Sequence, residues 1–329
     1  MEVLVVGLGS MGKRRIRLLM RFEEVTRIVG IDDREDRREE TRQNLGCDVF
    51  ASIEDALEVR PGIECAFICT SPLSHGALIS TALKKRLHIF TELNLVADGY
   101  EENIRMAKEA DRVLFLSSTF FYREEIQYIR QHINLSAKLN YVYHIGQYLP
   151  DWHPWESYKD FFVNDERTNG CREIMAIELP WLVGTFGDVK ALNVVSDNIS
   201  GLHIPYRDNY MIQLEHENGH KGTLIVDIVS PKAVRSLEIY GENQYFAWNG
   251  SPAGLECFDP ETKLVHKVTL REDAEQIEGY SAFVVENAYQ NEIRGFLDAV
   301  CCRVAPLYDF EKDLKILRLI DRIEAAGRG

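Results

Sequence analysis

The spacing of apolar residues changes along the chain, and its first third alternates between two periods. Short β-branched runs occur at residues 3–6, 27–31, 65–69, 88–90 and 113–116. Between them lie amphipathic stretches such as MGKRRIRLLMRF, in which Ile16, Leu19 and Met20 share one helical face. Strands that alternate with helices of this length predict an α/β fold with a doubly wound parallel sheet and right-handed crossovers.

The pattern differs after about residue 119. A helical segment, REEIQYIRQHI, precedes residues 191–269, where longer strands are separated by the turn signals NGHKG, GEN and NGSPAG. This pattern is typical of a large open, mostly antiparallel sheet, and the chain becomes helical again from about residue 286. A chain of 329 residues is expected to form two domains. We place them at residues 1–119 and 120–329, the second being an α+β domain.

Charge and cysteine content indicate which binding partners and which cellular location to expect. A net charge of -14, from 38 basic and 52 acidic side chains, would repel phosphate backbones, so no nucleic-acid partner is expected. Seven scattered cysteines without a C-x-x-C pair predict no metal site and a reducing, cytoplasmic location. The first strand, EVLVVG, begins at once, so we expect no signal peptide, and no apolar run has the length of a membrane span.

The strongest local signal is GLGSMG, which follows the first predicted strand and opens a helix. In this context the pattern predicts a dinucleotide site. Gly7 makes the tight turn, Gly9 admits the pyrophosphate, and Gly12 lets the helix pack on the sheet. Ser10 and Met11 begin that helix, whose N–H groups and dipole would hold the phosphates. The motif therefore predicts a dinucleotide-binding Rossmann domain at residues 1–119.

The second strand, RIVGIDD, ends in two carboxylates. Asp32 and Asp33 lie where an acidic side chain takes the ribose hydroxyls and repels the 2′-phosphate of NADP. Arg34 can stack on adenine or receive that phosphate. We expect NAD as the cofactor, with NADP as the alternative. The residues beyond Arg34 in DDREDRREE are expected to be a solvated helix start.

Two further strand ends extend the predicted cofactor site, because open sheets bind ligands at the carboxyl ends of their strands. One strand is expected to end at Cys69, and the turn after it, which is expected to border the cofactor, consists of Thr70, Ser71, Pro72 and His75. We expect His75 to shape the pocket and not to catalyse. The run LHIF leads into TELNLV, where Glu92 and Asn94 can hydrogen-bond a cofactor or substrate.

These motifs together resemble the family of glucose-fructose oxidoreductase, inositol dehydrogenase and the rhizopine-catabolism protein (Gfo/Idh/MocA). The resemblance rests on GLGSMGKRR, TSPLSH, the strand running into Glu92, and the tail AYQNEIRGFLDAV with DLKILRLIDRIEAA. It implies a Rossmann domain and a second domain whose open sheet often builds oligomers, here a homodimer or homotetramer. The implied activity is NAD(P)-dependent hydride transfer at a hydroxyl or carbonyl carbon of a sugar, cyclitol or nucleotide-sugar derivative.

The chain departs from the family at both catalytic motifs. Where members usually carry Glu-Lys-Pro, this chain has Glu92, Leu93 and Asn94. The second motif of the family has an aspartate followed by a histidine on a helix; alignment on residues 186–187 puts the aspartate on Glu173 and the histidine on Ile177. Neither Leu93 nor Ile177 can move a proton.

Other side chains of the second domain are candidates for the proton transfer that hydride removal from a carbinol requires. In GCREIMAIELPWL, Glu173 lies four positions before Ile177 and shares its helical face. We expect His153 or Glu173 to be the acid/base and Arg172 to bind an anionic substrate group. The tryptophans of DWHPWESY could stack on a sugar. Alternatively, Arg172 and Glu173 form a buried ion pair and these aromatics pack an interface.

The loss of both usual proton-transfer groups is compatible with three other functions. One is a pseudoenzyme that binds a nucleotide or sugar as a sensor. The second is a hydrolase or lyase that transiently reduces and regenerates bound NAD, and the third is an enzyme that reduces a non-sugar carbonyl or imine.

Overall fold

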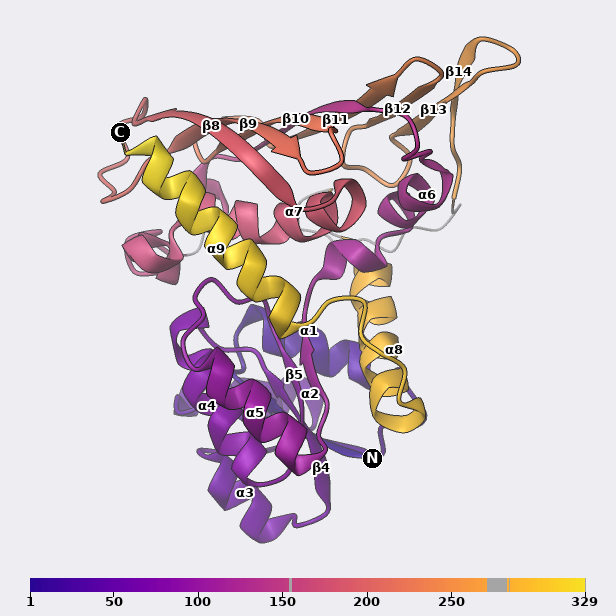
Figure 1. The fold of residues 1–329 in the computed structure, drawn as a ribbon. Helices are drawn as coiled ribbons and strands as arrows, with labels where there is room; N and C mark the ends of the chain where they lie inside the picture. Colours follow the sequence, from indigo (N-terminus) through magenta and orange to yellow (C-terminus); the bar gives the residue numbers. More distant parts are fainter. Residues whose placement is uncertain (154–155, 271–282, 284, 329) are drawn as a thin grey trace. The chain divides into compact units, whose positions relative to one another are not determined.

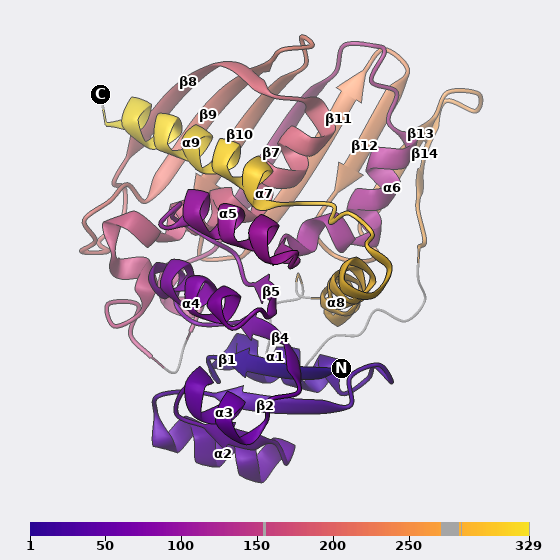
Figure 2. The same ribbon diagram turned by 60° about the horizontal axis from the view of Figure 1, so that its bottom comes forward.

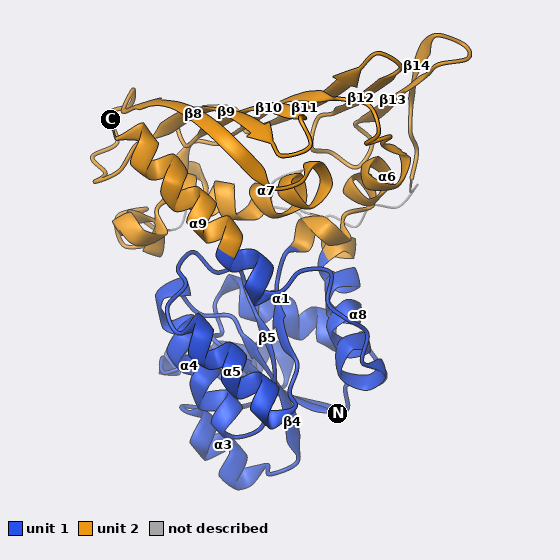
Figure 3. Ribbon diagram, in the orientation of Figure 1, with its two compact units in different colours: residues 1–118, 289–314 blue, residues 119–288, 315–329 orange. Residues whose placement is uncertain are grey.

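The computed structural model of the protein describes residues 1–153, 156–270, 283 and 285–328. Two compact units are formed (Figure 3), one by residues 1–118 with 289–314 and the other by residues 119–288 with 315–329. We expected the whole chain after residue 119 to belong to the second domain. In the structure, residues 289–314, from the C-terminal helical region, belong to unit 1 instead. Each unit is described separately below.

Unit 1 is built on a six-stranded parallel sheet in the order β3-β2-β1-β4-β5-β6. Its strands are β1 (Glu2–Val6), β2 (Arg27–Ile31), β3 (Asp48–Phe50), β4 (Ile63–Ile68), β5 (His88–Thr91) and β6 (Leu114–Leu116). The central strands β1 and β4 are buried along almost their whole length, so they appear in the sequence as continuous apolar runs. The strand order reverses between β1 and β4, which makes the carboxyl edge there the expected ligand site.

Helices lie on both faces of this sheet (Figures 1 and 2). They are α1 (Ser10–Leu19), α2 (Glu35–Leu45), α3 (Ile53–Val59), α4 (Pro72–Lys84), α5 (Tyr100–Ala110), most of α8 (Glu286–Cys302) and the start of α9 (Phe310–Gly327). On α8, the Phe296 ring packs edge-on against Phe67, Phe90 and Phe115, which stand side by side on β4, β5 and β6. This aromatic contact explains why a helix so late in the sequence belongs to unit 1.

The ends of these helices follow from local sequence. Ser52 accepts a hydrogen bond from the Asp55 N–H at 3.1 Å and caps α3. Pro72 occupies the first turn of α4, where its missing N–H costs nothing. Gly46 ends α2 with a φ of 65°, a left-handed conformation that glycine adopts without strain.

Unit 2 is built on an eight-stranded sheet in the order β14-β13-β12-β11-β7-β10-β9-β8. The strands are β7 (Asn140–Gly146), β8 (Val189–Asp197), β9 (Asn209–His216), β10 (Lys221–Asp227), β11 (Val234–Gly241), β12 (Gln244–Trp248), β13 (Leu255–Asp259) and β14 (Leu264–Lys267). All neighbours are antiparallel except β7 and β10. Strand β9 alternates between buried and more exposed positions, so this sheet has one core face and one outer face.

The core face of this sheet is covered by helices (Figure 1). They are α6 (Glu124–His132), α7 (Gly170–Phe186) and the end of α9, with short 3-10 turns η1 (Thr119–Tyr122), η2 (Leu149–Asp151), η3 (Phe162–Asn164) and η4 (Glu166–Thr168). Helix α7 is buried on almost every side. The ionisable side chains of α7 therefore need partners or a function.

The predicted fold class is confirmed, since a parallel sheet is followed by a larger, mostly antiparallel one. The strands expected near residues 65–69 and 113–116 occur as β4 and β6, shifted by one or two residues. The short strand β3 was not predicted. Among the described residues no helix combines the length and the apolar character needed to cross a bilayer.

Candidate functional site

The glycine loop between β1 and α1 is held by close backbone contacts. Gly7 has a φ of 93°, and a Cβ atom there would lie 2.7 Å from the carbonyl oxygen of Cys69. A Cβ on Gly12 would lie 1.8 Å from the Gly7 carbonyl oxygen. Both positions therefore require glycine. Gly7 allows the turn to pack against the end of β4, and Gly12 allows α1 to pack against the loop.

Gly9 is different, because the space over it is open. Outside its chain neighbours, the nearest atom to a Cβ built on Gly9 is Nη1 of Arg37, at 3.9 Å. Gly9 is also the N-cap of α1; as a glycine it brings no side-chain cap, and the first turn has no acidic residue. The N–H groups in the first turn of a helix and the positive end of the helix dipole suit an anion. The loop therefore fits the pyrophosphate of a dinucleotide, with Ser10 and Met11 in the first turn of the helix.

The carboxylates at the end of β2 have separate environments. Asp32 is buried, and its carboxylate accepts the Leu8 N–H at 2.8 Å and the Arg34 N–H at 3.0 Å. Asp33 is exposed. The Arg34 side chain turns away and forms an ion pair with Asp36 on the surface. Asp32 therefore ties the end of β2 to the glycine loop.

At the end of β4, the predicted turn residues divide into surface and buried positions. The Thr70 and Ser74 hydroxyls are 2.7 Å apart, Ser71 is exposed and is the N-cap of α4, and Pro72 follows it. His75 is 2% exposed and lies 2.9 Å from the Thr70 carbonyl oxygen and 2.6 Å from Oδ1 of Asn94. Burial lowers the pKa of His75.

His75 and Asn94 are both buried, so this pair supports the turn from within and does not offer its groups to solvent. This arrangement agrees with a shaping role for His75. It also directs Asn94 into the interior, although the sequence predicted cofactor or substrate contact for that side chain.

Glu92, at the end of β5, is held by a fully buried arginine that the sequence analysis did not single out. Arg15 on α1 contacts Glu92 at 2.6 Å and Glu292 on α8 at 2.7 Å, and its guanidinium lies over the Phe90 ring. The Ser117 hydroxyl donates to Glu292 at 3.0 Å. Burial alone would lower the pKa of Arg15, but the two carboxylates raise it above its usual value. The signal available in the sequence was the RR pair four residues into the helix of the glycine motif.

The predicted cofactor residues come from the carboxyl ends of four neighbouring strands, β2, β1, β4 and β5. Since the sheet is parallel, these ends share one edge, and the structure brings the glycine loop, the Asp32 turn, the Thr70 turn and Glu92 to it. His75 and Asn94 lie beneath that edge.

In unit 2, the structure separates the ionisable residues of α7 by their partners. Glu178 is fully buried and satisfied: it accepts Tyr143 and Trp181 at 2.8 Å each and pairs with Arg235 at 2.7 Å. Oε2 of Glu173 is buried and has no hydrogen-bond partner in the described part of the chain. Burial raises the pKa of Glu173 to about 7. Glu173 can therefore hold or release a proton near neutral pH.

Arg172 lies next to Glu173 in sequence but points to other carboxylates. It contacts Glu324 at 2.7 Å and Asp321 at 2.8 Å, both on α9, and it is 6% exposed. The buried ion pair that the sequence allowed between Arg172 and Glu173 is not formed among the described residues, and α9 supplies the partners of Arg172 instead.

His153 lies in the loop after η2. Its ring is 2.7 Å from Glu156 and 4.2 Å between centroids from Phe161. The Trp152 indole donates to the Gln147 carbonyl oxygen at 3.2 Å, and Trp155 lies outside the described residues. No contact within the described residues joins His153 to Glu173, and none of their His, Cys, Asp and Glu side chains form a cluster suited to a metal ion.

The structure also places a buried tyrosine near Glu173, which the sequence analysis did not predict. Tyr206, in the segment between β8 and β9, is 7% exposed, and its hydroxyl faces the backbone of Gly170. Burial, together with Cys171 and Glu173, raises the pKa of Tyr206. The sequence carried no signal for this residue, because an isolated tyrosine in a loop has no motif.

Comparison with known proteins assigns the N-terminal part. Residues 1–118 match the model of the family GFO_IDH_MocA, described as an oxidoreductase family with an NAD-binding Rossmann fold. Over 117 residues the chain is 28% identical to myo-inositol 2-dehydrogenase of Thermotoga maritima. That match spans 35% of this chain and 35% of the relative, so it concerns the Rossmann part alone.

Solved structures resemble the whole chain in fold. UDP-N-acetylglucosamine 3-dehydrogenase from Acidithiobacillus ferrooxidans has a TM-score of 0.78 at 17% identity, over 99% of this chain and 97% of that one. An NADPH-dependent oxidoreductase, titled putative, from Desulfitobacterium hafniense has a TM-score of 0.81 at 16% identity, over 99% and 95%. The resemblance seen in the sequence is thus confirmed over residues 1–118, which match the model of this oxidoreductase family with its NAD-binding Rossmann fold, and the whole chain shares its fold with these solved structures.

Proposed function

We propose that the protein is an NAD(P)-dependent oxidoreductase that transfers a hydride to or from a hydroxyl or carbonyl carbon of a sugar, cyclitol or nucleotide-sugar derivative. The observation that carries this proposal is the open space over Gly9 at the start of α1, within a domain that matches the NAD-binding family model. The substrate class is supported by the inositol dehydrogenase and nucleotide-sugar dehydrogenase among the similar proteins.

The chain's own residues divide the work between binding and proton transfer. The glycine loop would hold the pyrophosphate through backbone N–H groups, and the turn at Asp32 would border the adenosine ribose. Bound NAD(P) supplies the hydride acceptor or donor. The protein must then accept or give the hydroxyl proton, and Leu93 and Ile177 cannot do so.

We assign that proton to Glu173. Its unpartnered carboxylate oxygen and its pKa of about 7 allow it to change protonation state at neutral pH. His153 remains the second candidate, already engaged with Glu156. Arg172 is engaged with Glu324 and Asp321, so any role in anion binding would require it to leave them.

The test is to incubate purified protein with NAD or NADP and a panel of sugars, cyclitols, uronic acids and nucleotide sugars while following the absorbance of the reduced cofactor. Turnover that is lost in Glu173→Gln and retained in Glu217→Gln, an exposed glutamate before β10, supports the assignment. Cofactor binding without turnover of any substrate would favour the sensor function, and no binding of either dinucleotide would refute the proposal.

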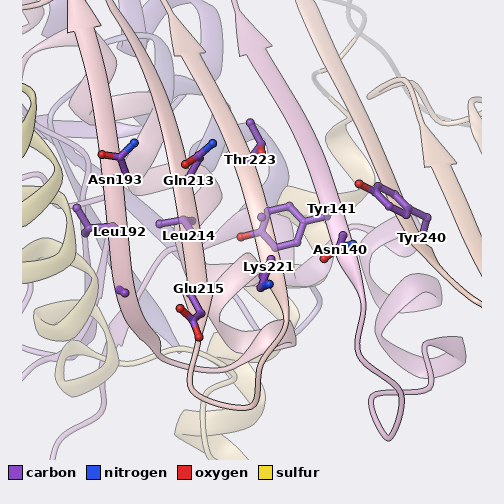
Figure 4. A pocket seen from close by; sticks show the side chains of 12 residues that line it. Asn140, Tyr141, Leu192, Asn193, Gln213, Leu214, Glu215, Lys221, Thr223 and Tyr240 are labelled. Atoms are coloured by element: carbon purple, nitrogen blue, oxygen red, sulfur yellow. The ribbon is translucent and has the colours of Figure 1, made fainter.

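We also propose that the outer face of the unit 2 sheet joins copies of the chain into a homodimer or homotetramer. A hollow of about 490 Å³ lies on this sheet. Figure 4 shows side chains that line it, among them Asn193, Gln213 and Thr223. Val195 on β8 is 63% exposed and Met211 on β9 is 56% exposed. The two residues are paired in register, so they lie side by side on the same face of the sheet. Light scattering of the wild type and of Met211→Glu tests this, with a fall in mass expected for the variant.

A cytoplasmic location is proposed on the seven cysteines, which are all free thiols. Fractionation of the source cells with antibody detection would test it.

A further inference from the structure

A chain of buried polar side chains lies in unit 1 behind the turn that borders the proposed cofactor site, and the proposed function does not use it. Each of its members is at most 3% exposed. They come from α4, the segment after β5, the start of α5 and the region where α9 begins: His75, Asn94, Tyr100, Tyr308 and Asp313. Buried polar groups persist where their hydrogen bonds are made, so the direction of each bond can be followed along the chain.

The direction is fixed at the Asp313 end. Asp313 lies in the first turn of α9, where the helix dipole favours an ionised carboxylate. The Tyr100 hydroxyl donates to its Oδ2, and the Tyr308 hydroxyl donates to its Oδ1 at 2.7 Å. Asp309 adds negative charge near Tyr308 and is itself paired with Lys312 at 3.4 Å. A carboxylate only accepts, so Tyr100 gives its single proton to Asp313 and keeps only lone pairs for another neighbour.

Asn94 transmits this direction to His75. Its amide faces the Tyr100 hydroxyl, and Nδ2 has no other hydrogen-bond partner among the described residues. Because the Tyr100 oxygen can only accept here, the NH₂ group of Asn94 belongs on the Tyr100 side and Oδ1 on the His75 side. Oδ1 of Asn94 accordingly lies 2.6 Å from Nδ1 of His75.

His75 then faces an oxygen atom from each of its two ring nitrogens. Besides the contact with Asn94, its Nε2 lies 2.9 Å from the Thr70 carbonyl oxygen. A neutral imidazole has one N–H and can donate to one of these oxygens, whereas the imidazolium donates to both. The direction of the chain therefore favours the charged form of His75.

The other neighbours of the ring act in the same sense, against the effect of burial. Burial lowers the pKa of His75, while its hydrogen-bond partners and the Glu92 carboxylate raise it. Glu92 is at the same time paired with Arg15 at 2.6 Å. The Thr91 hydroxyl, 3.4 Å from Nδ1 of His75, donates to the Glu92 carbonyl oxygen and so presents lone pairs to the ring.

We infer that Tyr100 and Asp313 are positioning residues for the turn that borders the cofactor. By fixing the Asn94 amide, they favour the protonated form of His75, which donates one N–H to Oδ1 of that amide and the other to the Thr70 carbonyl oxygen. The inference rests on the proposed function, because it assumes that a dinucleotide binds at this turn. Deprotonation would leave two acceptors in contact, Nδ1 and Oδ1, so the turn should be held less firmly as the pH rises through the pKa of His75.

The test follows the titration of His75 by NMR in the full chain with isotope-labelled histidine, its signal being assigned from its loss in His75→Gln. Tyr100→Phe removes the hydroxyl that fixes the amide and leaves the Asp313 carboxylate in place. We expect the midpoint of His75 to fall by about one pH unit relative to the wild type. Tyr308→Phe is the matched control, because Tyr308 donates to the other oxygen of Asp313, and its midpoint should stay at the wild-type value.

Asp313→Asn provides a second variant that keeps the size of the side chain and does not depend on the folding of Tyr100→Phe. It should also lower the midpoint of His75, because the amide that replaces the carboxylate no longer forces Tyr100 to act as a donor. An unchanged midpoint in either variant overturns the inference. An equal shift in Tyr308→Phe overturns it as well, since it would trace the effect to a general loosening around Asp313.

Calorimetric titration with NAD at several pH values tests the link to the cofactor. In the wild type the affinity should fall by about threefold as the pH rises through the measured midpoint of His75, and in Tyr100→Phe this fall should occur at lower pH. An affinity that does not change across the midpoint overturns the positioning role. Failure of the wild type to bind NAD or NADP counts against the proposed function itself, whereas the NMR comparison still decides the direction of the chain.

Discussion

The edge of the unit 1 sheet and helix α7 of unit 2 both hold glutamates in buried surroundings, but only α7 has one, Glu173, with an oxygen that finds no partner among the described residues. At the edge, Glu92 and Glu292 share one buried arginine, and Ser117 adds a further donor. On α7, Glu178 is equally well satisfied by Arg235, while Glu173 five residues earlier has a buried oxygen without a partner. Two glutamates on the same helix thus differ in whether their carboxylate oxygens have hydrogen-bond or ion-pair partners.

This difference indicates where to look for function. A satisfied buried carboxylate costs a great deal when its partner is removed, yet it has no capacity left for a substrate. An unsatisfied one is costly to the fold and persists where it has another use. The comparison therefore predicts that changes at Arg15 will act on stability and that changes at Glu173 will act on turnover.

The largest effect is expected for Arg15→Met. Removal of the guanidinium would leave the fully buried Glu292 and the largely buried Glu92 without their cation, and breaking a buried ion pair typically costs about 3–5 kcal/mol. Urea unfolding followed by circular dichroism should show a large fall in the midpoint, or the variant should fail to accumulate as folded protein. Arg15→Lys, which keeps the charge, should recover part of the loss, and Arg105→Gln, at an exposed ion pair, should change little. A urea midpoint for Arg15→Met close to that of the wild type would contradict the prediction that the ion pairs of Arg15 stabilise the fold.

The next effect concerns turnover. Glu173→Gln keeps the size of the side chain but cannot exchange the proton, and loss of a general acid or base typically lowers kcat about a hundredfold or more. Binding of NAD should be unchanged, because the glycine loop is untouched. Glu178→Gln is the informative partner variant: it should lower the melting temperature while the folded fraction keeps its activity. The opposite assignment of effects to the two variants would show that the unsatisfied carboxylate is not the functional one.

A smaller and more selective effect is expected at the glycine loop. Gly9→Ala adds a methyl group into open space, so the melting temperature should hold while the affinity for NAD falls by roughly tenfold or more, since the pyrophosphate must approach this backbone. Gly12→Ala would collide with the Gly7 carbonyl oxygen and should lower both quantities. Equal NAD affinity in wild type and Gly9→Ala would mean that no dinucleotide approaches this loop.

Sequence could predict the unit 1 edge because that site is built from backbone. Gly7 and Gly12 are required by contacts of less than 3 Å, and such requirements leave a motif. Alternating apolar runs likewise predicted both sheets. The connection of Phe296 to the aromatic row on β4, β5 and β6 left no local sign, because it depends on a contact across most of the chain.

The side-chain networks were not predictable for the same reason. Arg15 looked like one more cation on an amphipathic helix, and Arg37 like part of a solvated face. What distinguishes them is the partner that each contacts in the folded chain. Arg15 contacts the carboxylates of Glu92 and Glu292, and Arg37 lies 3.6 Å from the carboxylate of Asp32. Periodicity reports which face a residue takes, but not which charges it meets there.

The smallest expected effect is a pH dependence of stability that belongs to Glu173. Its pKa of about 7 in the folded protein lies above the usual value of 4.5, so between these values the native state holds a proton that the unfolded chain has lost. The neutral carboxyl therefore favours the fold fully below about pH 4.5, and this contribution is lost as the pH rises through about 7. The free energy of unfolding should decline by on the order of 1 kcal/mol more in the wild type than in Glu173→Gln between about pH 6 and pH 7. Urea titrations of both proteins at several pH values measure that difference, and parallel curves would place the Glu173 carboxylate in contact with water or a cation.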